Sequence, residues 1–160
     1  MTTTTHTALD VTFRPESLAR VWDEALALAP AHWDQAGHPE CAFRLDRSLY
    51  ERMEEAGALR LFTVREDATA RLLGYASFFV GPHPHSAVLQ ASQDALYLMP
   101  EARQGWTALS FLRFLDAQLA AAGVDLILQH AGPTTALAVL LRRRKYHLHA
   151  ELYAKRVEHG

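Results

Sequence analysis

The sequence has one cysteine, Cys41, among 160 residues, so no disulfide can form within the chain. A chain without disulfides is suited to a reducing compartment, and we expect it in the cytoplasm. The surroundings of the cysteine, HPECAF, do not resemble a nucleophile turn. We therefore interpret Cys41 as a buried thiol and not as a catalytic nucleophile.

The sequence also lacks a long apolar run and an excess of charge of one sign. No apolar stretch reaches the roughly 20 residues that a membrane-spanning helix needs, and we expect no membrane partner. The opening MTTTTHTALD does not combine a basic region with a following apolar one, so we expect no secretory signal. The formal net charge of −2 argues against general binding to nucleic acid.

The composition is typical of a globular protein, because 49% of the residues are apolar and 21% are charged. A chain of 160 residues is long enough to bury a sizeable core and has the usual length of one domain. No internal repeat, low-complexity linker or change in composition divides it. We expect a single domain over residues 1–160, with residues 1–8 as a flexible tail.

The hydrophobic pattern predicts a mixed α/β domain. Alternation or short apolar runs predict strands over 9–15, 59–66, 71–81, 87–99, 124–130 and 147–157. Apolar residues at helical spacing predict helices over 16–29, 46–58, 106–123 and 134–146. The run VDLILQH over 124–130 is typical of a short, fully buried strand in a parallel pairing.

Capping and breaking residues set several of these boundaries. Asp46 is a plausible N-cap for the second helix and Gly57 a plausible stop. Pro30 is expected to end the first helix, which leaves the following residues as a loop, and Pro100 is expected to close the strand over 87–99.

The stretch MPEARQGWTALSFL, residues 99–112, is open to two interpretations. It could be an ordinary turn between a strand and a helix, or a cradle for an anionic cofactor. Amides in the first turn of a helix have no partner within the helix, and the helix dipole adds positive charge there, so phosphates bind readily. Gly105 would allow a close backbone approach, and Arg103 would add a fixed charge with planar donors.

The order of these elements resembles that of the GNAT acyl-CoA N-acetyltransferases. A strand, the turn P-E-x-R-x-G, a long amphipathic helix, a buried strand and a helix ending in an aromatic follow one another. The sequence from His85 to Ile127 is most similar to those of GNAT proteins encoded by phages and prophages. The resemblance covers nearly the whole chain and implies the GNAT fold, a mixed central sheet of six to seven strands with four helices.

The resemblance implies acetyl-CoA as co-substrate, bound between the fourth and fifth strands. It places the backbone of Leu98 and Met99 against the pantetheine arm and the acetyl carbonyl. It places around the pyrophosphate Arg103, Gln104, Gly105, Trp106, Thr107 and Ala108. Thr134 stands where many members have an asparagine that faces the cofactor.

The sequence departs from the family pattern at two places. The turn is R-x-G-x-x-A, one residue tighter than the common R/Q-x-x-G-x-G/A. The tyrosine that many members use as general acid for the leaving thiolate is replaced by Leu141, which cannot donate a proton. Tyr146 or water then remain as donors, or the step is unassisted, or the protein does not catalyse.

Two residues are candidates for the general base that an amine nucleophile requires. Asp94 precedes ALYLM on the strand that resembles the acetyl-binding one; the alternative for it is a salt bridge or an exposed strand start. His85 lies in the loop before this strand, and the alternative for it is a solvated loop histidine. By analogy with GNAT folds, His32 and Trp33 would wall the acceptor site.

The nine histidines do not predict a metal site. The pairs at 83 and 85 and at 147 and 149 would share a strand face, but no cysteine or carboxylate ligands stand at a set spacing beside them. We therefore expect no metal. The run RRRK over 142–145 is interpreted mainly as a solvated helix end whose cations complement the dipole.

The sequence as a whole predicts an N-acetyltransferase that moves an acetyl group from acetyl-CoA directly to an amine on a small molecule or a protein. The alternative is a non-catalytic GNAT-fold interaction protein, for example a phage structural or regulatory component. A homodimer is possible on the same resemblance, because an exposed last strand would offer an edge for pairing.

Overall fold

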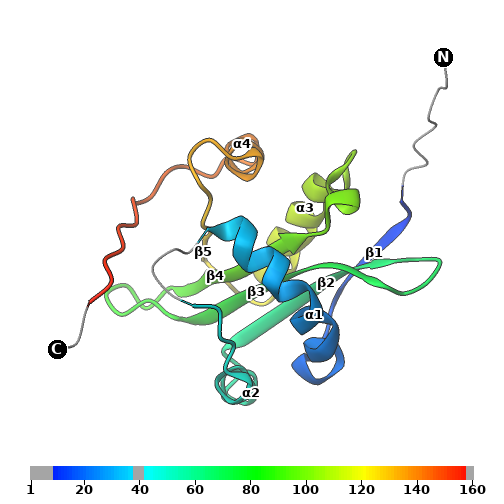
Figure 1. Ribbon diagram of the computed structural model, residues 1–160. Helices are drawn as coiled ribbons and strands as arrows, with labels where there is room; N and C mark the ends of the chain where they lie inside the picture. Colours follow the sequence, from blue (N-terminus) through cyan, green and yellow to red (C-terminus); the bar gives the residue numbers. More distant parts are fainter. Residues whose placement is uncertain (1–8, 38–41, 158–160) are drawn as a thin grey trace.

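The computed structural model describes residues 9–37 and 42–157, so Cys41 and the tail expected over 1–8 lie outside the described residues. Its five strands form one sheet in sequence order (Figure 1). They are β1 (Val11–Pro15), β2 (Leu59–Glu66), β3 (Leu72–Pro82), β4 (Leu89–Leu98) and β5 (Leu126–Leu128). The first four strands pair antiparallel. The last strand, β5, pairs parallel to β4, which confirms the parallel pairing predicted for residues 124–130.

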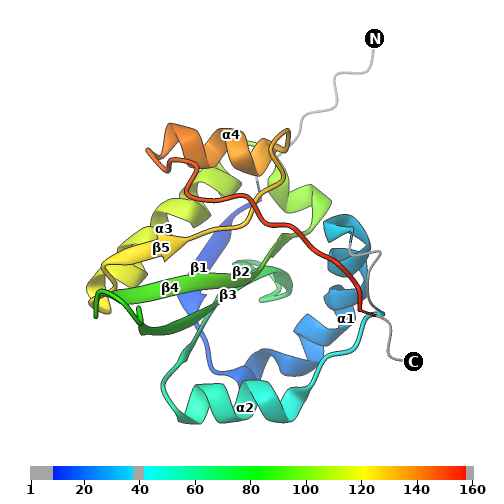
Figure 2. The same cartoon turned by 90° about the vertical axis from the view of Figure 1, so that its left-hand side faces the viewer.

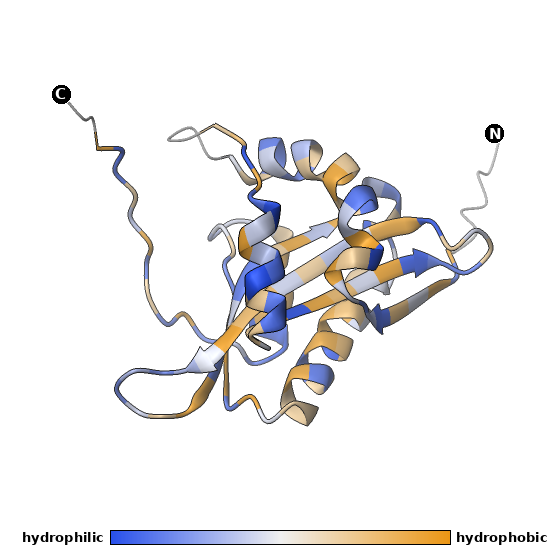
Figure 3. Cartoon of the chain, turned by 90° about the horizontal axis from the view of Figure 1, so that it is seen from below, coloured by the Kyte–Doolittle hydropathy of each residue, from blue (hydrophilic) through white to orange (hydrophobic). Residues whose placement is uncertain are grey.

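The helices cover both faces of the sheet. They are α1 (Leu18–Ala36), α2 (Arg47–Glu55), α3 (Thr107–Ala121) and α4 (Ala136–Arg143), with a 3₁₀ turn, η1 (Pro100–Arg103), between β4 and α3. The sheet lies between α1 and α2 on one side and α3 and α4 on the other (Figure 2). Figure 3 shows hydrophobic and hydrophilic stretches together on the helices, as amphipathic helices that cover a sheet require.

The alternation of side chains along the strands divides the core into two layers. Toward α3, the sheet presents Phe62 and Phe78 to a helix face that includes Phe111 and Leu115. Toward α1, a smaller cluster joins Val21 to Leu72, Tyr75 and Tyr97. The second layer is rich in tyrosine, which gives this side of the sheet buried hydroxyl groups.

The first helix is longer than predicted, because Pro30 lies inside it and does not end it. The helix continues to Ala36 and is capped by Gly37 at φ 66°, whose N–H donates to the carbonyl of Trp33 at 3.2 Å. Proline removes one helical hydrogen bond and pushes the preceding turn aside, and α1 bends between its two halves (Figure 2). The packing of the second half against the sheet outweighs the lost bond.

The predicted last strand is wrong: residues 147–157 form no strand, and the described sheet has five strands where six to seven were expected. The segment runs extended away from α4 (Figure 1), and Leu152 is 86% exposed. Alternation satisfies the side-chain pattern of a strand, but a strand also needs a partner for its backbone. The β5 residues are half-buried, not fully buried as predicted, because β5 is the last strand of the sheet.

Several predicted boundaries are confirmed. Asp46 caps α2 by accepting the N–H of Leu49 at 3.2 Å, and Gly57 follows the helix at φ 70°. Pro100 closes β4 and opens η1. No helix within the described residues is long and apolar enough to cross a membrane.

Candidate active site

The sheet opens between β4 and β5, as the resemblance implied. The two strands pair only from Gln90 opposite Leu126 to Ser92 opposite Leu128, while β4 continues to Leu98. The remaining residues of β4 therefore have no strand beside them on that edge within the described chain. The opening is bordered by the backbone of β4.

The phase of the β3–β4 ladder decides which backbone groups border this opening. The N–H of Met99 donates to the carbonyl of Leu73 at 2.8 Å, so Met99 faces β3. Because backbone groups alternate in direction along an antiparallel pair, Leu98 and Leu96 point theirs toward the opening. Leu96 was missed by the sequence reasoning, although the two-residue period of a strand connects it to Leu98.

The backbone of Met99 is engaged within the chain at both of its polar groups, since its carbonyl also accepts the N–H of Ala102 at 2.9 Å. The carbonyl of Leu98 accepts Nε of Arg103 at 2.7 Å. Of the two residues expected against the pantetheine arm, Leu98 lies toward the opening, while Met99 contributes to the sheet and to η1.

The turn after β4 leads into an uncapped helix. Gly105 adopts φ +63°, a left-handed conformation that favours glycine, and α3 begins two residues later at Thr107. No described side chain caps the first turn of α3. Trp106 is 75% exposed and Gln104 is exposed as well, while Thr107 and Ala108 are half-buried. Such a helix start leaves its first amides available to an anion.

Arg103 lies on the α1 side of this turn. Besides the Leu98 carbonyl, its guanidinium donates to the side chain of Gln35 and lies 5.5 Å from the ring centroid of Tyr97. Arg103 thus joins the end of β4 to the end of α1. Its spacing from Gly105 in the sequence did not reveal this direction, because Gln35 is 68 residues away.

On the α1 face of the sheet lies a cavity of about 180 Å³. Its walls come from α1, α2, β2, β3, β4 and the segment before α2. Most of the lining side chains are apolar or aromatic. Imidazole, hydroxyl or carboxylate groups come from His32, Tyr50, Tyr75, Ser77 and Asp94. The cavity adjoins β4 on the side opposite to α3.

Asp94 enters this cavity because β4 bulges at that residue. Ser77 pairs with Ala95 and Phe78 pairs with Gln93, so Asp94 is the extra residue between them. Its Oδ2 accepts the hydroxyl of Ser77 at 2.6 Å and that of Tyr50 at 2.9 Å. The carboxylate is therefore held by hydroxyl groups, and no salt bridge to it is found among the described residues.

The tyrosines beside Asp94 are poor acids. Burial raises the pKa of Tyr50, and the Asp94 carboxylate raises it further. Burial also raises the pKa of Tyr75, with smaller contributions from Tyr97 and Asp94. Both phenols stay protonated at neutral pH, and the Tyr50 phenol donates to Asp94.

His32 and Trp33 both line the cavity. Nδ1 of His32 lies 3.0 Å from the Tyr75 hydroxyl, and its ring stacks on Tyr97 with centroids 5.2 Å apart. These two residues reach the wall because α1 continues beyond Pro30.

His85 lies away from the cavity, in the turn between β3 and β4, and its ring contacts that of His83. This turn precedes β4, whereas the sheet opens toward the other end of that strand. Asp94 is the sixth residue of β4, so about 17 Å of strand separate it from the end of β4 at this turn. The structure does not bring His85 together with Asp94, which favours the solvated loop histidine.

Tyr146 lies on the α3 side of the sheet. Its hydroxyl donates to Oδ1 of Asp116 at 2.6 Å and accepts from Nε2 of Gln129 at 3.2 Å. Burial, and then the Asp116 carboxylate, raises the pKa of Tyr146. Arg144 also binds Asp116, at 2.6 Å. The phenol proton is therefore held within this network.

The remaining predicted positions lie on or beside α4. Leu141 is 6% exposed and belongs to the core. Thr134 is exposed just before Thr135, which caps α4 by accepting the N–H of Ala138 at 3.3 Å.

The expectation of no metal stays a prediction. Within the described residues, no group of three or more His, Cys, Asp or Glu is placed to hold a metal ion. His147 and His149 lie in the segment that forms no strand, so the reason to place them on one face does not apply.

Comparison with known proteins gives a fold. No family model matches the sequence, and no curated protein matches it either. Among solved structures, a ribosomal-protein-alanine N-acetyltransferase from Brucella melitensis biovar Abortus 2308 aligns with a TM-score of 0.68 and 17% identity, over 94% of this chain and 99% of that one. An aminoglycoside acetyltransferase from an uncultured soil metagenomic sample, in complex with sisomicin, aligns with a TM-score of 0.71 and 8% identity, over 92% and 97%.

A third structure is a predicted acetyltransferase with acetyl-CoA from Clostridium acetobutylicum, with a TM-score of 0.69 and 12% identity over 91% of this chain and 96% of that one. The protein therefore has the GNAT fold, with five strands and four helices in its described part. Identities this low establish the fold alone. The likeness to phage-encoded proteins has no support among these three structures.

Proposed function

We propose that this protein is an N-acetyltransferase that moves an acetyl group from acetyl-CoA directly to an amine. One observation carries the proposal: the opening between β4 and β5 is flanked by an uncapped helix start on one side of the sheet and by the Asp94 cavity on the other. The two halves of a transfer reaction, a site for an anionic donor and a site for an acceptor, would meet at β4.

The donor half would be held by backbone groups. The first amides of α3 and the turn at Gly105 suit the pyrophosphate, which favours the cradle over an ordinary turn. The backbone groups of Leu96 and the N–H of Leu98 suit the pantetheine arm and the acetyl carbonyl, whereas the Leu98 carbonyl already accepts Arg103. When bound, acetyl-CoA supplies the acetyl group as a thioester; the chain contributes orientation and hydrogen bonds to the developing oxyanion.

Asp94 is the group that would receive the amine proton. The bound ammonium first gives one proton to the Asp94 carboxylate, directly or through one water, because the nitrogen needs a free lone pair to attack. As the nitrogen–carbon bond then forms and the carbon–sulfur bond breaks, the nitrogen gives its second proton to water. Leu141 cannot protonate the leaving thiolate, and the proton of Tyr146 is bound to Asp116 on the other side of the sheet. Water is therefore the proton donor for the thiolate in this proposal.

Calorimetric titration with acetyl-CoA tests the donor half, with desulfo-CoA and ATP as comparison ligands. Gly105→Glu should lower the affinity for acetyl-CoA at least tenfold, because it places a carboxylate where the pyrophosphate would bind. Gly123→Glu is the matched control: it lies after the other end of α3, and both glycines have positive φ and open space around a built Cβ. Equal acetyl-CoA affinity in the two variants would show that the pyrophosphate does not bind at this turn.

The second candidate function is a non-catalytic GNAT-fold protein, which Leu141 favours. Thiol release from acetyl-CoA, measured with a broad panel of amines, separates the two. Amine-dependent release above the amine-free rate supports the transferase. A folded protein that releases no thiol with any amine would contradict it, whether or not the protein binds acetyl-CoA.

A further inference from the structure

We propose that the acceptor is a small monoamine with an aromatic or compact apolar body, whose ammonium group binds Asp94 and whose body fills the cavity. This inference rests on the proposed function, because it names the acceptor of the same site. The size of the cavity, the chemistry of its walls and the free oxygen of one carboxylate support it.

The size of the cavity suits one ring. An apolar cavity of about 150 Å³ in another protein is large enough to bind benzene. The cavity here measures about 180 Å³, which leaves room for a ring and a short chain. A peptide or an oligosaccharide would have to lie mostly outside it.

The walls of the cavity are mostly apolar, and their described residues carry a single carboxylate. Trp22, Trp33 and Phe43 supply aromatic surface, and α1 adds aliphatic side chains. Of the described lining residues, Asp94 is the one carboxylate, and none is lysine or arginine. An apolar body gains free energy in such a cavity, whereas a second charge on the ligand would lose hydration without an opposite charge beside it.

The carboxylate of Asp94 has one oxygen committed and one available. The hydroxyls of Ser77 and Tyr50 both donate to Oδ2. Among the described residues, none donates a hydrogen bond to Oδ1. These two hydroxyls fix the plane of the carboxylate, so Oδ1 is a preset acceptor for an ammonium group in the cavity.

The same features disfavour two other classes of amine. A polyamino sugar would bring several ammonium and hydroxyl groups to a cavity with one carboxylate. A sugar phosphate would bring an anion to a cavity in which the described lining offers a carboxylate and no lysine or arginine. Both classes would bring into the cavity a charged group without an opposite charge, which costs more than the roughly 1–3 kcal/mol of an unpaired neutral group.

The test uses 2-phenylethylamine as the probe and titrates it into the whole chain without acetyl-CoA. We expect saturable binding, with 2-phenylethanol, kanamycin and glucosamine-6-phosphate each at least tenfold weaker. Asp94→Asn should weaken the amine at least tenfold and leave acetyl-CoA affinity within twofold. Binding of the alcohol as tight as that of the amine would overturn the role of Asp94.

A pair of variants on α1 tests the cavity independently of Asp94. Ala25→Phe fills the cavity and should weaken 2-phenylethylamine at least tenfold, whereas Ala27→Phe, on the exposed side of the helix, should not. Thermal melts check that both variants fold. Equal amine affinity in the two folded variants would place the amine elsewhere and overturn the inference.

The acceptor class and the transferase can fail separately. Turnover with other amines but neither binding nor acetylation of 2-phenylethylamine would overturn the acceptor class and leave the transferase. Binding of the probe that depends on Asp94 and Ala25, in a protein that does not bind acetyl-CoA, would support the cavity assignment and overturn the transferase.

Discussion

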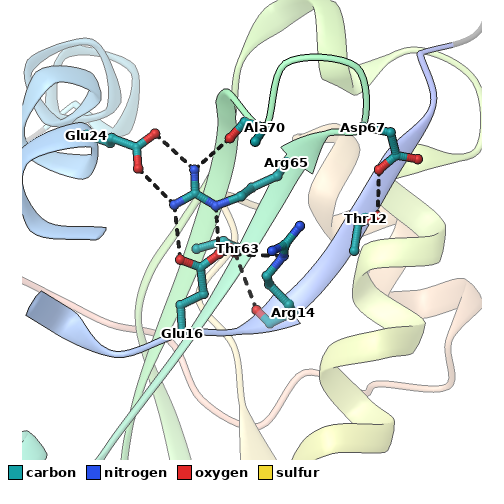
Figure 4. A network of polar contacts seen from close by, with 8 residues as sticks. All are labelled: Thr12, Arg14, Glu16, Glu24, Thr63, Arg65, Asp67 and Ala70. Carbon is teal, nitrogen blue, oxygen red and sulfur yellow. Dashed lines mark hydrogen bonds and ion pairs between the residues drawn. The ribbon is translucent and has the colours of Figure 1, made fainter. Parts of the chain in front are cut away.

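Arg65 joins three parts of the chain through one guanidinium group (Figure 4). The side chain extends from β2 and is 7% exposed. It binds Glu16 with Nε–Oε1 at 2.6 Å and Nη2–Oε2 at 3.0 Å, and it binds Glu24 of α1 with Nη2–Oε1 at 2.8 Å. It also donates to the carbonyl of Ala70 in the turn before β3, at 2.8 Å. The start of α1 is thereby tied to the sheet.

Removing this cation should be costly. Arg65→Met leaves the buried Glu16 carboxylate without its main partner, and we expect the free energy of unfolding to fall by about 3–5 kcal/mol. Arg71→Met is the matched control, because Arg71 is half-exposed and its contacts with Glu101 and Glu66 are 3.3 and 3.6 Å long. A surface pair of this kind contributes about 0–1 kcal/mol. Urea unfolding followed by circular dichroism measures both; equal losses would contradict the assigned burial.

The cluster of Arg65, Glu16 and Glu24 also determines how the stability of the fold depends on pH. Hydrogen bonds from Arg65 hold the pKa of Glu16 and of Glu24 below their ordinary value of 4.5, against the opposing effect of burial. A carboxyl with a lowered folded-state pKa stabilises the fold above its unfolded pKa, and this contribution is lost as the pH falls through the folded-state value. Melting temperatures should therefore fall below about pH 4.5, and less steeply in Glu16→Gln. A parallel decline in both proteins would rule out Glu16 as a source.

The sequence predicted residue types better than side-chain directions. The position of Asp94 before ALYLM indicated a candidate base on β4. The bulge that turns its side chain into the cavity could not be predicted, because it depends on pairing with β3. The Arg65 cluster was not predicted, because Glu16 and Glu24 lie 49 and 41 residues away in the sequence. Periodicity reports on neighbours within an element, and these contacts connect elements.

Among the elements, β3 and β4 leave no room for a side chain at Gly74. A Cβ built on Gly74 would lie 2.5 Å from the carbonyl oxygen of Tyr97 and 2.5 Å from a methyl group of Leu98. The strands could not keep this spacing around any larger residue. Gly74 thus sets the position of Leu98, which borders the opening in the sheet.

Gly74→Ala should force these strands apart and lower the free energy of unfolding by about 1–3 kcal/mol. Gly81→Ala, in the same strand, has nothing within 4 Å of the built Cβ and should change stability by less than about 0.5 kcal/mol. Denaturant unfolding gives both values, and calorimetry should show weaker acetyl-CoA binding in the folded Gly74→Ala protein. An unchanged free energy of unfolding in Gly74→Ala would mean that β4 shifts to make room for the methyl group.

Element boundaries could be predicted where a local signal decides them. The range of β2 was predicted to the residue, and the capping of α2 by Asp46 followed from its side chain. The end of α1 could not be predicted, because Pro30 is a local signal to stop while the reason to continue is contact with a distant strand. His32 reaches Tyr75 only through that continuation.

At the scale of the whole molecule, residues 147–157 add little to the described packing. Their side chains are exposed, and Leu148 and Leu152 are more than four-fifths exposed. The described core ends instead with the network of Arg144, Tyr146 and Asp116, which holds the end of α4 to α3.

Truncation after Tyr146 should therefore leave the melting temperature within about 2 °C of the full chain, a shift that corresponds to under about 1 kcal/mol. Truncation after Arg143 is the comparison, because it removes both groups that bind Asp116 and should lower the melting temperature more. Differential scanning calorimetry distinguishes the two. A large loss in the longer variant would show that the last segment packs against the rest of the chain.

The overall fold was predictable because the order of strands and helices is a property of the whole pattern. The parallel strand after the long helix was predicted and confirmed, whereas a sixth and seventh strand were not found in the described residues. The alternation of apolar and polar residues over 147–157 is compatible with a strand, but it does not indicate which strand would pair with it.

For the proposed transferase, the bend in α1 bears on which acceptors fit the cavity. Pro30 has no amide hydrogen, so the carbonyl of Leu26 lacks its usual helical donor, and α1 consists of two rods that meet at a bend (Figure 2). The first rod carries Val21 into the core, while the second carries His32 and Trp33 over the cavity. We expect the second rod to swing without disturbing the first, so that amines somewhat larger than the resting cavity can enter at little cost to the fold.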